Sequence, residues 1–349
     1  MADHDLDPLI SRADLDGLVR LIDARCASHD WEGLLRIRER SRFALETGRQ
    51  LWPAATLAEY RLALLAPADW ATRVLDEDSG RFTVGPLTEV IAQNHPWDEL
   101  RDLLPIGPRR SFVAYERALR GEWIDARELG DLELALEIPL ANQDWEPEYP
   151  VPTYSDEGLH APCPADSWTH DWKTVDGRAG GLEVIRDDDV DNAFRSLIDP
   201  WTTSSNGRAE SFIVEGGPED AVRALGVTGG RLTPIDHSQA LAWMAWCGAS
   251  GGAYGRRRGA ALGRFGVWWM LAALGGFSDE WDQLCRRGTL GAECGNTARS
   301  MTWFRFDDGM TGPFDLSLIA CDPSDGRRSD HSDDDPIDNS IILLARDSA

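Results

Sequence analysis

The chain has 349 residues, of which 42% are hydrophobic and 15 are tryptophan, so it is long enough to form two domains with sizeable cores. Its 60 acidic and 35 basic residues give a formal charge of −25, and the resulting repulsion argues against nucleic acid or a membrane as a partner. The six cysteines are scattered without a CxxC pair, which indicates a reducing compartment such as the cytoplasm rather than a disulfide framework.

The N-terminal part is expected to be helical. Its first residues, MADHDLDPLISRADLDG, lack a basic segment followed by an apolar core, so they do not have the pattern of a secretory signal. After them, apolar residues recur at the spacing of one helix face: Leu15, Leu18, Val19, Ile22 and Cys26. Ser11 or Asp14 is available as the N-terminal cap. Residues 12 to about 135 therefore predict a series of short amphipathic helices.

A loose tryptophan motif recurs in this helical part. Its four copies are HDWEGLLRI from residue 29, ADWATRVL from 68, HPWDELRDLL from 95 and GEWIDAREL from 121. Helical hairpins of the tetratricopeptide type often begin with such a pattern, but these copies do not keep one fixed period. Two interpretations remain open, an irregular repeat-like layer or ordinary amphipathic helices that each use a tryptophan as a core anchor.

Residues 136–181 differ in composition and predict an ordered connector. Prolines are dense here and interrupt regular elements. Five large aromatic residues argue against a disordered linker: Trp145, Tyr149, Tyr154, Trp168 and Trp172. The chain is thus expected to comprise a helical, repeat-like domain at 1–135, a proline-rich connector at 136–181 and a further domain at 182–349.

The domain at 182–349 combines helix and strand patterns. Helices are predicted at 218–226 and 236–248, and strands at 210–216, 300–307, 314–322 and 340–347. Helices packed on a small antiparallel sheet account for this order of elements. The expected fold class of the whole chain is α+β, mainly α.

The stretch SGGAYGRRRGAALGRFGVWWMLAALGG, residues 250–276, concentrates glycine, arginine and tryptophan. Glycine recurs at every fourth residue from Gly251 to Gly263, so a helix over 255–275 would carry glycines on one side and let a second backbone approach closely. The apolar window at 265–277 is shorter than the roughly 20 residues that cross a bilayer. Close helix packing is therefore the favoured interpretation of this stretch.

A phosphate-binding loop is the second interpretation of the same stretch. Loop amides at the start of a helix, together with guanidinium groups, would bind an anion. The candidate ligand-binding residues are Gly251, Gly252, Gly255, Arg256, Arg257 and Arg258. The strand of a dinucleotide fingerprint and the lysine of a P-loop are both missing, and carboxylates of the chain itself are competing partners for these arginines.

Ser250 lies in GASGG, which matches the G-x-S-x-G pattern of a nucleophile elbow. Asp322 and His331 follow it in the order of a hydrolase triad. An elbow needs a strand before the serine, whereas the residues before Ser250 predict a helix. A serine hydrolase is therefore the least favoured alternative.

Two acidic stretches carry residue types that bind metal ions. Asp187, Asp189 and Asp191 match the first ligand positions of a calcium loop, but Ile198 stands where a bidentate glutamate is required, so capping of a helix is favoured. The aspartate-rich loop at 322–339 needs no metal, and the histidines do not approach the spacing of zinc ligands. We predict no metal site and no cofactor.

The strings AWMAWCGASGGAYGRRRGAALGRFGVWWMLAAL, MTWFRFDDG and FDLSLIACD resemble an uncharacterised actinobacterial family that is known only as a domain of unknown function. The resemblance covers about residues 140–349. It implies a bacterial cytosolic protein and supplies no activity.

The sequence leads to three hypotheses about function. The first is a non-enzymatic interaction or scaffold protein whose helical layer binds an unknown protein partner. The second is binding of a small phosphate-bearing molecule at residues 251–258. The third is a serine hydrolase at Ser250.

Overall fold

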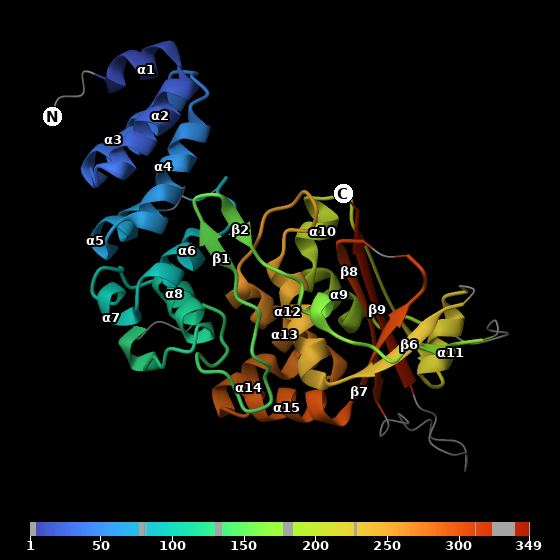
Figure 1. The fold of residues 1–349 in the computed structure, drawn as a ribbon. Coiled ribbons are helices and arrows are strands. Elements are labelled where there is room, and N and C mark those ends of the chain that lie inside the picture. Colours follow the sequence, from blue (N-terminus) through green and yellow to red (C-terminus); the bar gives the residue numbers. More distant parts are fainter. Residues whose placement is uncertain are drawn as a thin grey trace. The chain divides into compact units, whose positions relative to one another are not determined.

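The computed structural model describes residues 5–76, 80, 82–129, 135–176, 184–226, 229–310, 312–322 and 339–348. Their fold is α+β and mainly α, which confirms the predicted class. Two compact units are present: the first comprises Met1–Ala135 and Pro152–His160, and the second comprises Leu136–Val151 and Ala161–Ala349 (Figure 1). Residues of the proline-rich stretch at 136–181 thus contribute to both units.

Short helices build the first unit. They are α1 (Leu6–Arg12), α2 (Leu15–Ala27), α3 (Trp31–Glu46), α4 (Trp52–Leu65), α5 (Ala68–Ala71), α6 (Leu87–Asn94), α7 (Trp97–Leu100) and α8 (Pro108–Leu119), with 3-10 turns at Thr72–Val74 and Ala126–Leu129. Asp14 caps α2 by accepting a hydrogen bond from the amide of Gly17 at 2.8 Å, and Asp30 caps α3 through the amide of Gly33 at 2.9 Å. These caps explain why both helices begin where they do.

The four motif tryptophans have different surroundings. Trp97 is buried at the start of α7, whereas Trp31 and Trp70 are half-buried in α3 and α5. Trp123 is 77% exposed and precedes the last 3-10 turn of the unit. The core-anchor interpretation therefore holds for Trp97 and does not extend to Trp123.

A hairpin from the proline-rich stretch completes the first unit. Strands β1 (Thr153–Ser155) and β2 (Gly158–His160) are antiparallel and lie beside α6, as the green arrows show in Figure 1. The phenol of Tyr154 donates to Oε2 of Glu89, a buried carboxylate, at 2.5 Å. The amide of the same tyrosine donates to Oε1 of Gln93 at 2.6 Å. A charge-assisted hydrogen bond thus attaches the hairpin to α6.

The second unit is built on a seven-stranded antiparallel sheet with the strand order β3-β6-β7-β8-β9-β5-β4. The strands are β3 (Lys173–Thr174), β4 (Val184–Ile185), β5 (Arg208–Glu215), β6 (Arg231–Ile235), β7 (Thr302–Asp307), β8 (Phe314–Asp322) and β9 (Asn339–Asp347). The central strands β8 and β9 are buried on both faces, which explains their nearly continuous apolar runs LSLIAC and SIILLA.

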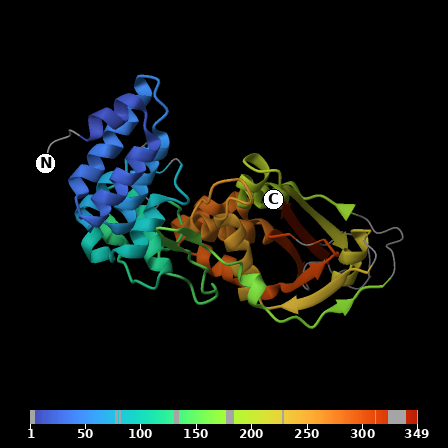
Figure 2. The same ribbon diagram turned by 45° about the horizontal axis from the view of Figure 1, so that its top comes forward.

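Helices cover both faces of this sheet (Figure 2). On one face, α11 (Pro218–Ala224) packs Ala221 and Val222 against a cluster that includes Ile319 and Ile342. On the other face lie α9 (Asp188–Leu197) and α12 (His237–Ala249), and α13 (Ala260–Leu274) packs against both of these helices. The remaining helices of the unit are α10 (Asp199–Thr203), α14 (Trp281–Arg287) and α15 (Leu290–Ser300), with 3-10 turns at Pro164–Ser167 and Ser278–Glu280.

Helices α12 and α13 approach each other closely at glycine. A Cβ atom on Gly263 would lie 2.2 Å from the carbonyl oxygen of Ala245, so a side chain has no room there. This confirms the prediction of close packing. The expectation of a glycine row on a helix over 255–275 is wrong, because α13 begins at Ala260 and its cap Gly259 has a φ of 106°. Gly251, Gly255 and Gly259 therefore precede the helix.

A buried ion pair joins α13 to the segment before the hairpin. The side chains of Arg264 and Glu146 are both fully buried, and Nη2 of the arginine lies 2.7 Å from Oε2 of the glutamate. The indole of Trp268 also donates to Oε1 of Glu146 at 2.6 Å.

In the described part of the chain, no single helix is long and apolar enough to cross a membrane. The helical segments Ala260–Leu274 and Ser278–Arg287 reach that length and hydropathy only when taken together, and they are bent by 116° relative to each other.

Candidate functional site

The glycine-rich loop before α13 is held by polar groups of the chain itself. The amide of Ala253 donates to Oδ2 of Asp347 at 2.6 Å, and the amide of Tyr254 donates to Oγ of Ser205 at 3.2 Å. Ser205 in turn donates to Oδ1 of Asp347 at 2.9 Å. Asp347 ends β9 and is 1% exposed. A buried carboxylate of β9 thus accepts the loop's hydrogen bonds, in the manner expected of a bound anion.

The three arginines of this loop differ in exposure. Arg256 is exposed and Arg257 is buried. Arg258 is half-buried, burial lowers the pKa of its guanidinium, and its Nη1 donates to the carbonyl oxygen of Ser196 at 2.8 Å. Ligand binding by the residues from Gly251 to Arg258 remains a prediction.

Ser250 follows the last residue of α12, and its Oγ accepts a hydrogen bond from the amide of Gly252 at 3.0 Å. A helix precedes it, as the sequence predicts, so the strand-to-helix turn of a nucleophile elbow is not formed here. Among the described residues no histidine is hydrogen-bonded to Ser250, and His331 lies outside them. The geometry gives the hydrolase hypothesis no support.

The acidic residues from 187 to 191 begin a helix. Oδ1 of Asp187 accepts hydrogen bonds from the amides of Asp189 at 3.0 Å and Val190 at 3.1 Å, which confirms the capping interpretation. Within the described ranges, no group of three or more His, Cys, Asp or Glu side chains could hold a metal ion. Residues 323–338, most of the acidic loop, lie outside those ranges.

The first unit contains a cleft along its α3–α4 hairpin, with a volume of about 410 Å³. It is lined by Arg42, Phe43, Leu45, Glu46, Trp52, Ala55, Thr56, Glu59 and Phe82. The helical repeat explains this set, because Arg42 and Glu46 are one turn apart on α3, and Trp52, Thr56 and Glu59 follow one another along α4. The cleft is therefore formed by facing stripes of two helices, with Phe82 added from the chain before α6.

Four of the lining side chains are large, apolar and exposed. Phe43, Leu45, Trp52 and Phe82 retain between 39% and 60% of their accessible surface. The rings of Trp52 and Phe82 have centroids 4.7 Å apart and are tilted by 43°, so they support each other at the edge of the cleft. A group of exposed apolar side chains beside polar residues is typical of an interaction site.

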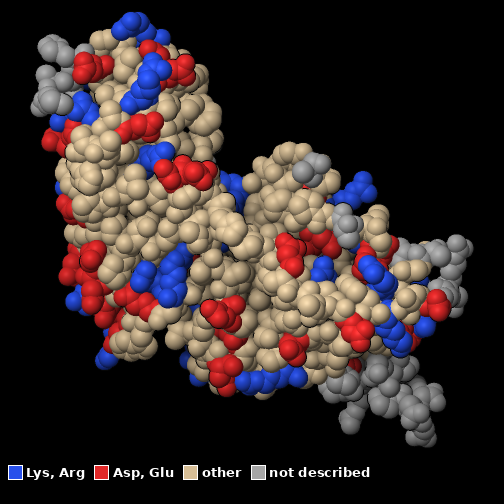
Figure 3. Space-filling model, in the orientation of Figure 1, with Lys and Arg blue, Asp and Glu red and all other residues tan. Residues whose placement is uncertain are grey.

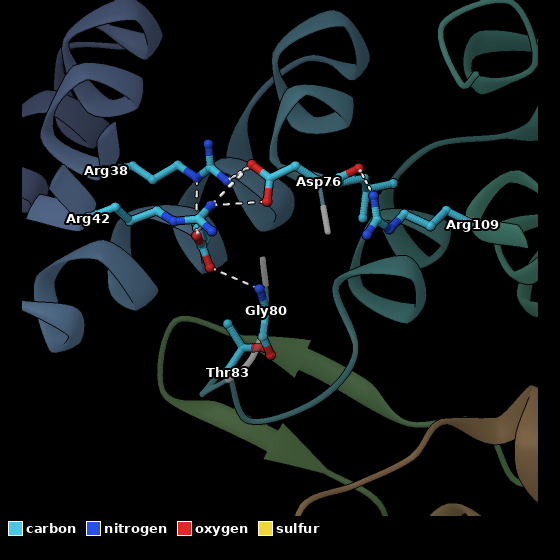
Figure 4. A network of polar contacts seen from close by, with 8 residues as sticks. Arg38, Arg42, Asp76, Gly80, Thr83 and Arg109 are labelled. Carbon is cyan, nitrogen blue, oxygen red and sulfur yellow. Dashed lines mark hydrogen bonds and ion pairs between the residues drawn. The ribbon is translucent and has the colours of Figure 1, made fainter. Parts of the chain in front are cut away.

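A charged network borders the cleft. Figure 4 shows Arg38 and Arg42 of α3 reaching toward Asp76. Nη1 of Arg42 lies 3.0 Å from Oδ1 of Asp76, and Arg38 also bonds this carboxylate. Nε of Arg38 donates to Glu59, a buried carboxylate, at 3.1 Å, and the other oxygen of Glu59 accepts the amide of Gly80 at 2.9 Å. Helices α3 and α4, Asp76 and Gly80 are therefore held together by ion pairs and hydrogen bonds.

The network keeps Asp76 ionised and attaches the neighbouring chain. Burial alone would raise the pKa of Asp76, but hydrogen bonds from Arg38 and Arg42 outweigh burial, so the pKa is lowered. Next to it, Arg109 of α8 donates to the carbonyl oxygen of Leu75 at 2.8 Å (Figure 4). These contacts fix Leu75 and Asp76 against α3 and α8.

Sequence reasoning did not find this cleft. One signal was present in α3, where the buried face includes Leu34, Ile37, Ser41 and Ala44, and Phe43 lies outside that face. A large aromatic residue outside the apolar face of a helix is a weak indication, because isolated exposed apolar residues are common. The cleft becomes recognisable when Phe43, Trp52 and Phe82 are seen together.

The comparisons with known proteins agree with the resemblance to a domain of unknown function. A family model described as a family of unknown function, DUF6183, matches residues 16–328, a range that includes the cleft residues and the glycine-arginine loop. Searches of curated proteins and of solved structures found no match. Because the model matches most of the sequence and extends across both units, the chain belongs to the DUF6183 family.

Proposed function

We propose that this protein is a non-enzymatic interaction protein whose cleft along α3 and α4 binds a segment of a partner polypeptide. One observation carries the proposal, namely that four exposed apolar side chains gather around a single cleft. A partner segment that covered them would remove apolar surface from water, which is the main favourable term in protein association.

The shape of the cleft favours a polypeptide over an enclosed small molecule. Sites for small molecules bury most of the ligand and are largely preformed and concave. Here the apolar lining keeps 39% to 60% of its surface exposed, so a broad partner is needed to cover it. The charged network borders the cleft and contributes Arg42 and Glu59 to its lining. The lowered pKa of Asp76 keeps this carboxylate ionised at neutral pH, so it is not poised to donate a proton as a catalytic acid would be.

Charge and cysteine chemistry support the remaining expectations. On the face shown in Figure 3, acidic and basic side chains are interspersed, and no continuous basic surface for a nucleic-acid backbone is visible there. The six cysteines are free thiols, as expected in a reducing compartment, and we infer a cytoplasmic location.

The proposal is tested by partner capture with Trp52→Ala and, as a matched control, Trp123→Ala. Trp123 is an exposed tryptophan of the same unit that does not line the cleft. We select a protein that the wild type and the control capture and that Trp52→Ala does not. This protein is then expressed, and its affinity for the wild type and for each variant is measured by calorimetry. We expect Trp52→Ala to weaken that affinity by about tenfold or more, because an aromatic residue in an interface cleft often dominates binding.

Thermal unfolding of each variant shows whether the fold is preserved. The proposal fails if Trp52→Ala, with its fold intact, captures the same proteins with the same affinity as the wild type.

A further inference from the structure

We propose that residues 161–175, named here the strap, form a pH-dependent latch whose middle is closed while His170 is neutral and opens when His170 takes up a proton. The strap lies wholly within the second unit and directly follows the β1–β2 hairpin. Its opening uncovers Trp243 of α12, which is 1% exposed in the closed form. The latch belongs to the second unit and is independent of the cleft in the first.

The strap is attached to the rest of the second unit at both of its ends. Nε1 of Trp246 in α12 donates a hydrogen bond to the carbonyl oxygen of Ala161 at 3.0 Å. At the other end β3 pairs with β6, and the amide of Val175 donates to the carbonyl oxygen of Gly230 at 2.8 Å. Because both ends are bonded, the contacts of the central residues decide whether the middle of the strap stays on α12 and the sheet.

One guanidinium, that of Arg305 in β7, holds the middle of the strap. Its Nη1 donates to the carbonyl oxygen of Ala165 at 3.2 Å and lies 2.8 Å from Nε2 of His170. Its Cζ lies 4.8 Å from the ring centroid of Trp243 and 5.7 Å from that of Trp172. Hydrogen bonds and cation–π attraction thus join β7, α12 and the strap at a single side chain.

This arrangement requires a neutral His170. Arg305 can only donate hydrogen bonds, so Nε2 of His170 accepts from it and the imidazole carries its proton on Nδ1. Uptake of a proton at Nε2 removes the acceptor and leaves two cations whose nitrogens are 2.8 Å apart. Their repulsion favours an open strap, in which water surrounds both charges. Burial and the charge of Arg305 lower the pKa of His170, so the closed form prevails at neutral pH.

The neighbouring strands do not compensate a second positive charge at this place. Within the residues that the structure describes, Arg305 forms no ion pair with a carboxylate. Asp307, on the same strand, is paired with Arg231 of β6 and also accepts the amide of Gly309 at 2.7 Å. The nearest carboxylate of the sheet is therefore already engaged when His170 becomes charged.

Helix α12 and the strap add no buried charge either. Between its ends α12 has no Asp, Glu, Lys or Arg, and its single histidine, His237, is its first residue. Burial raises the pKa of the Cys163 thiol to about 11 and raises that of Cys247 as well, so both thiols stay neutral. The other charged side chains of the strap are exposed to water: Asp166, Asp171 and Lys173.

The indole of Trp243 reports directly on the latch. Its Nε1 is buried, and in the described parts of the chain no group accepts a hydrogen bond from it, so its exchange with solvent depends on exposure. NMR measures this exchange in the full chain at pH 7.5 and pH 5.5, relative to free N-acetyltryptophanamide at the same pH, and Trp243→Phe assigns the signal. We expect the relative rate to be about threefold or more higher at pH 5.5, which lies below the ordinary pKa of histidine.

Trp201 of α10 is the matched indole, because its Nε1 is also buried and without an acceptor among the described residues. Its relative rate should be the same at both pH values. A rise at Trp201 as large as that at Trp243 would mean that acid loosens the whole unit, and the latch would be wrong.

Three variants test the role of His170. His170→Gln does not titrate and can accept from Arg305 through its amide oxygen, so Trp243 should exchange slowly at both pH values. His170→Lys is charged at both, so exchange should already be fast at pH 7.5. His160→Gln removes an exposed histidine of β2 in the first unit and should keep the response of the wild type.

Thermal unfolding shows whether each variant keeps its fold. The latch is refuted if the relative rate of Trp243 in the wild type is equal at both pH values, or if folded His170→Gln retains the acceleration at pH 5.5. Partner capture by the cleft is decided separately from both results.

Discussion

Single side chains connect the cleft to the stability of the first unit. Glu59 accepts Arg38 on one carboxylate oxygen and the amide of Gly80 on the other, while lining the cleft. Asp76 receives hydrogen bonds from both Arg38 and Arg42. The buried guanidinium of Arg38 and the half-buried one of Arg42 are therefore both paired, as a charge in a low-dielectric environment requires. The same residues hold α3, α4, Asp76 and Gly80 together.

Asp76 makes stability depend on pH in a defined direction. Its pKa is lowered in the folded state, so the unfolded chain binds its proton more readily. The stabilisation is present above about pH 4, the ordinary range of a carboxyl group, and is lost as the pH falls through the lowered pKa of the folded state. We expect Asp76→Asn to reduce the free energy of unfolding at pH 7 by about 1 kcal/mol, since the pair is partly exposed.

Urea unfolding between pH 2 and pH 8 measures this effect. The difference between the wild type and Asp76→Asn should shrink below about pH 4, whereas Asp69→Asn, an exposed residue of α5, should change stability little at any pH. A difference that persists unchanged at the lowest pH that maintains folding would contradict the assignment.

His170 gives a second pH dependence of stability. Its surroundings disfavour the charged form of the side chain, whereas those of Asp76 favour it. Burial is the main factor that lowers its pKa, and the charge of Arg305, whose Nη1 lies 2.8 Å from Nε2 of His170, lowers it further. The stabilisation is complete above about pH 6.5, the ordinary value for histidine, and decreases as the pH falls toward the lowered pKa of the folded state. In urea unfolding from pH 5 to pH 8, His170→Gln should show a smaller loss of stability at low pH than the wild type. An equal loss in both proteins would mean that other groups cause it.

At the scale of elements, the packing of α12 on α13 depends on the absence of a side chain at Gly263. Alanine usually stabilises a helix relative to glycine by about 1 kcal/mol. In α13 the added Cβ would lie 2.2 Å from a backbone oxygen of α12, which cannot move without shifting that helix. Steric overlap therefore outweighs helix propensity at this position.

We expect Gly263→Ala to lower the free energy of unfolding by about 1–3 kcal/mol, the usual cost of overpacking a core. Gly291→Ala in α15 is the matched control, because its Cβ would first meet the end of the flexible Gln143 side chain at 3.3 Å. Chemical denaturation of both variants measures the difference. If Gly263→Ala is as stable as the control, the two helices do not require this close approach.

At the scale of the whole molecule, the chain leaves the first unit and returns to it. The β1–β2 hairpin belongs to the first unit, although the residues on both sides of it in sequence belong to the second. The hydrogen bond between Tyr154 and Glu89 is made within the first unit and spans 65 positions of the chain. We therefore expect the hairpin to unfold together with the first unit, which it contacts, rather than with the residues that flank it in sequence.

Tyr154→Phe tests this division in the full chain. The variant removes one donor from Glu89, a buried carboxylate, which should destabilise the first unit by about 1–3 kcal/mol. Hydrogen exchange should become faster in α6 and α8, and it should stay unchanged in β8 and β9. Equal acceleration in all four elements would show that the two units unfold as one.

Local patterns determined much of the secondary structure. The helix after Asp14 and the strands β8 and β9 are recognisable because spacing, caps and apolar runs act over a few residues. The short strands β3, β4 and β6 have only two to five residues each, too few for a recognisable alternation, and they form by pairing with other strands. The predicted helix over 255–275 begins only at Ala260, because a spacing of four between glycines also fits the loop that holds Gly251, Gly255 and Gly259.

The sequence by itself determined the fold class and most long elements, because these depend on composition and local periodicity. Its glycine-arginine and strand strings also carried the resemblance to a family of unknown function. The tertiary structure alone decided where the candidate site lies. Phe43, Trp52 and Phe82 come from three separate segments, and Asp76 meets Arg38 across 38 positions of the chain. Which apolar side chains stay exposed, and which charges pair, depends on the packing of α3 against α4, an interaction between segments that local sequence patterns do not encode.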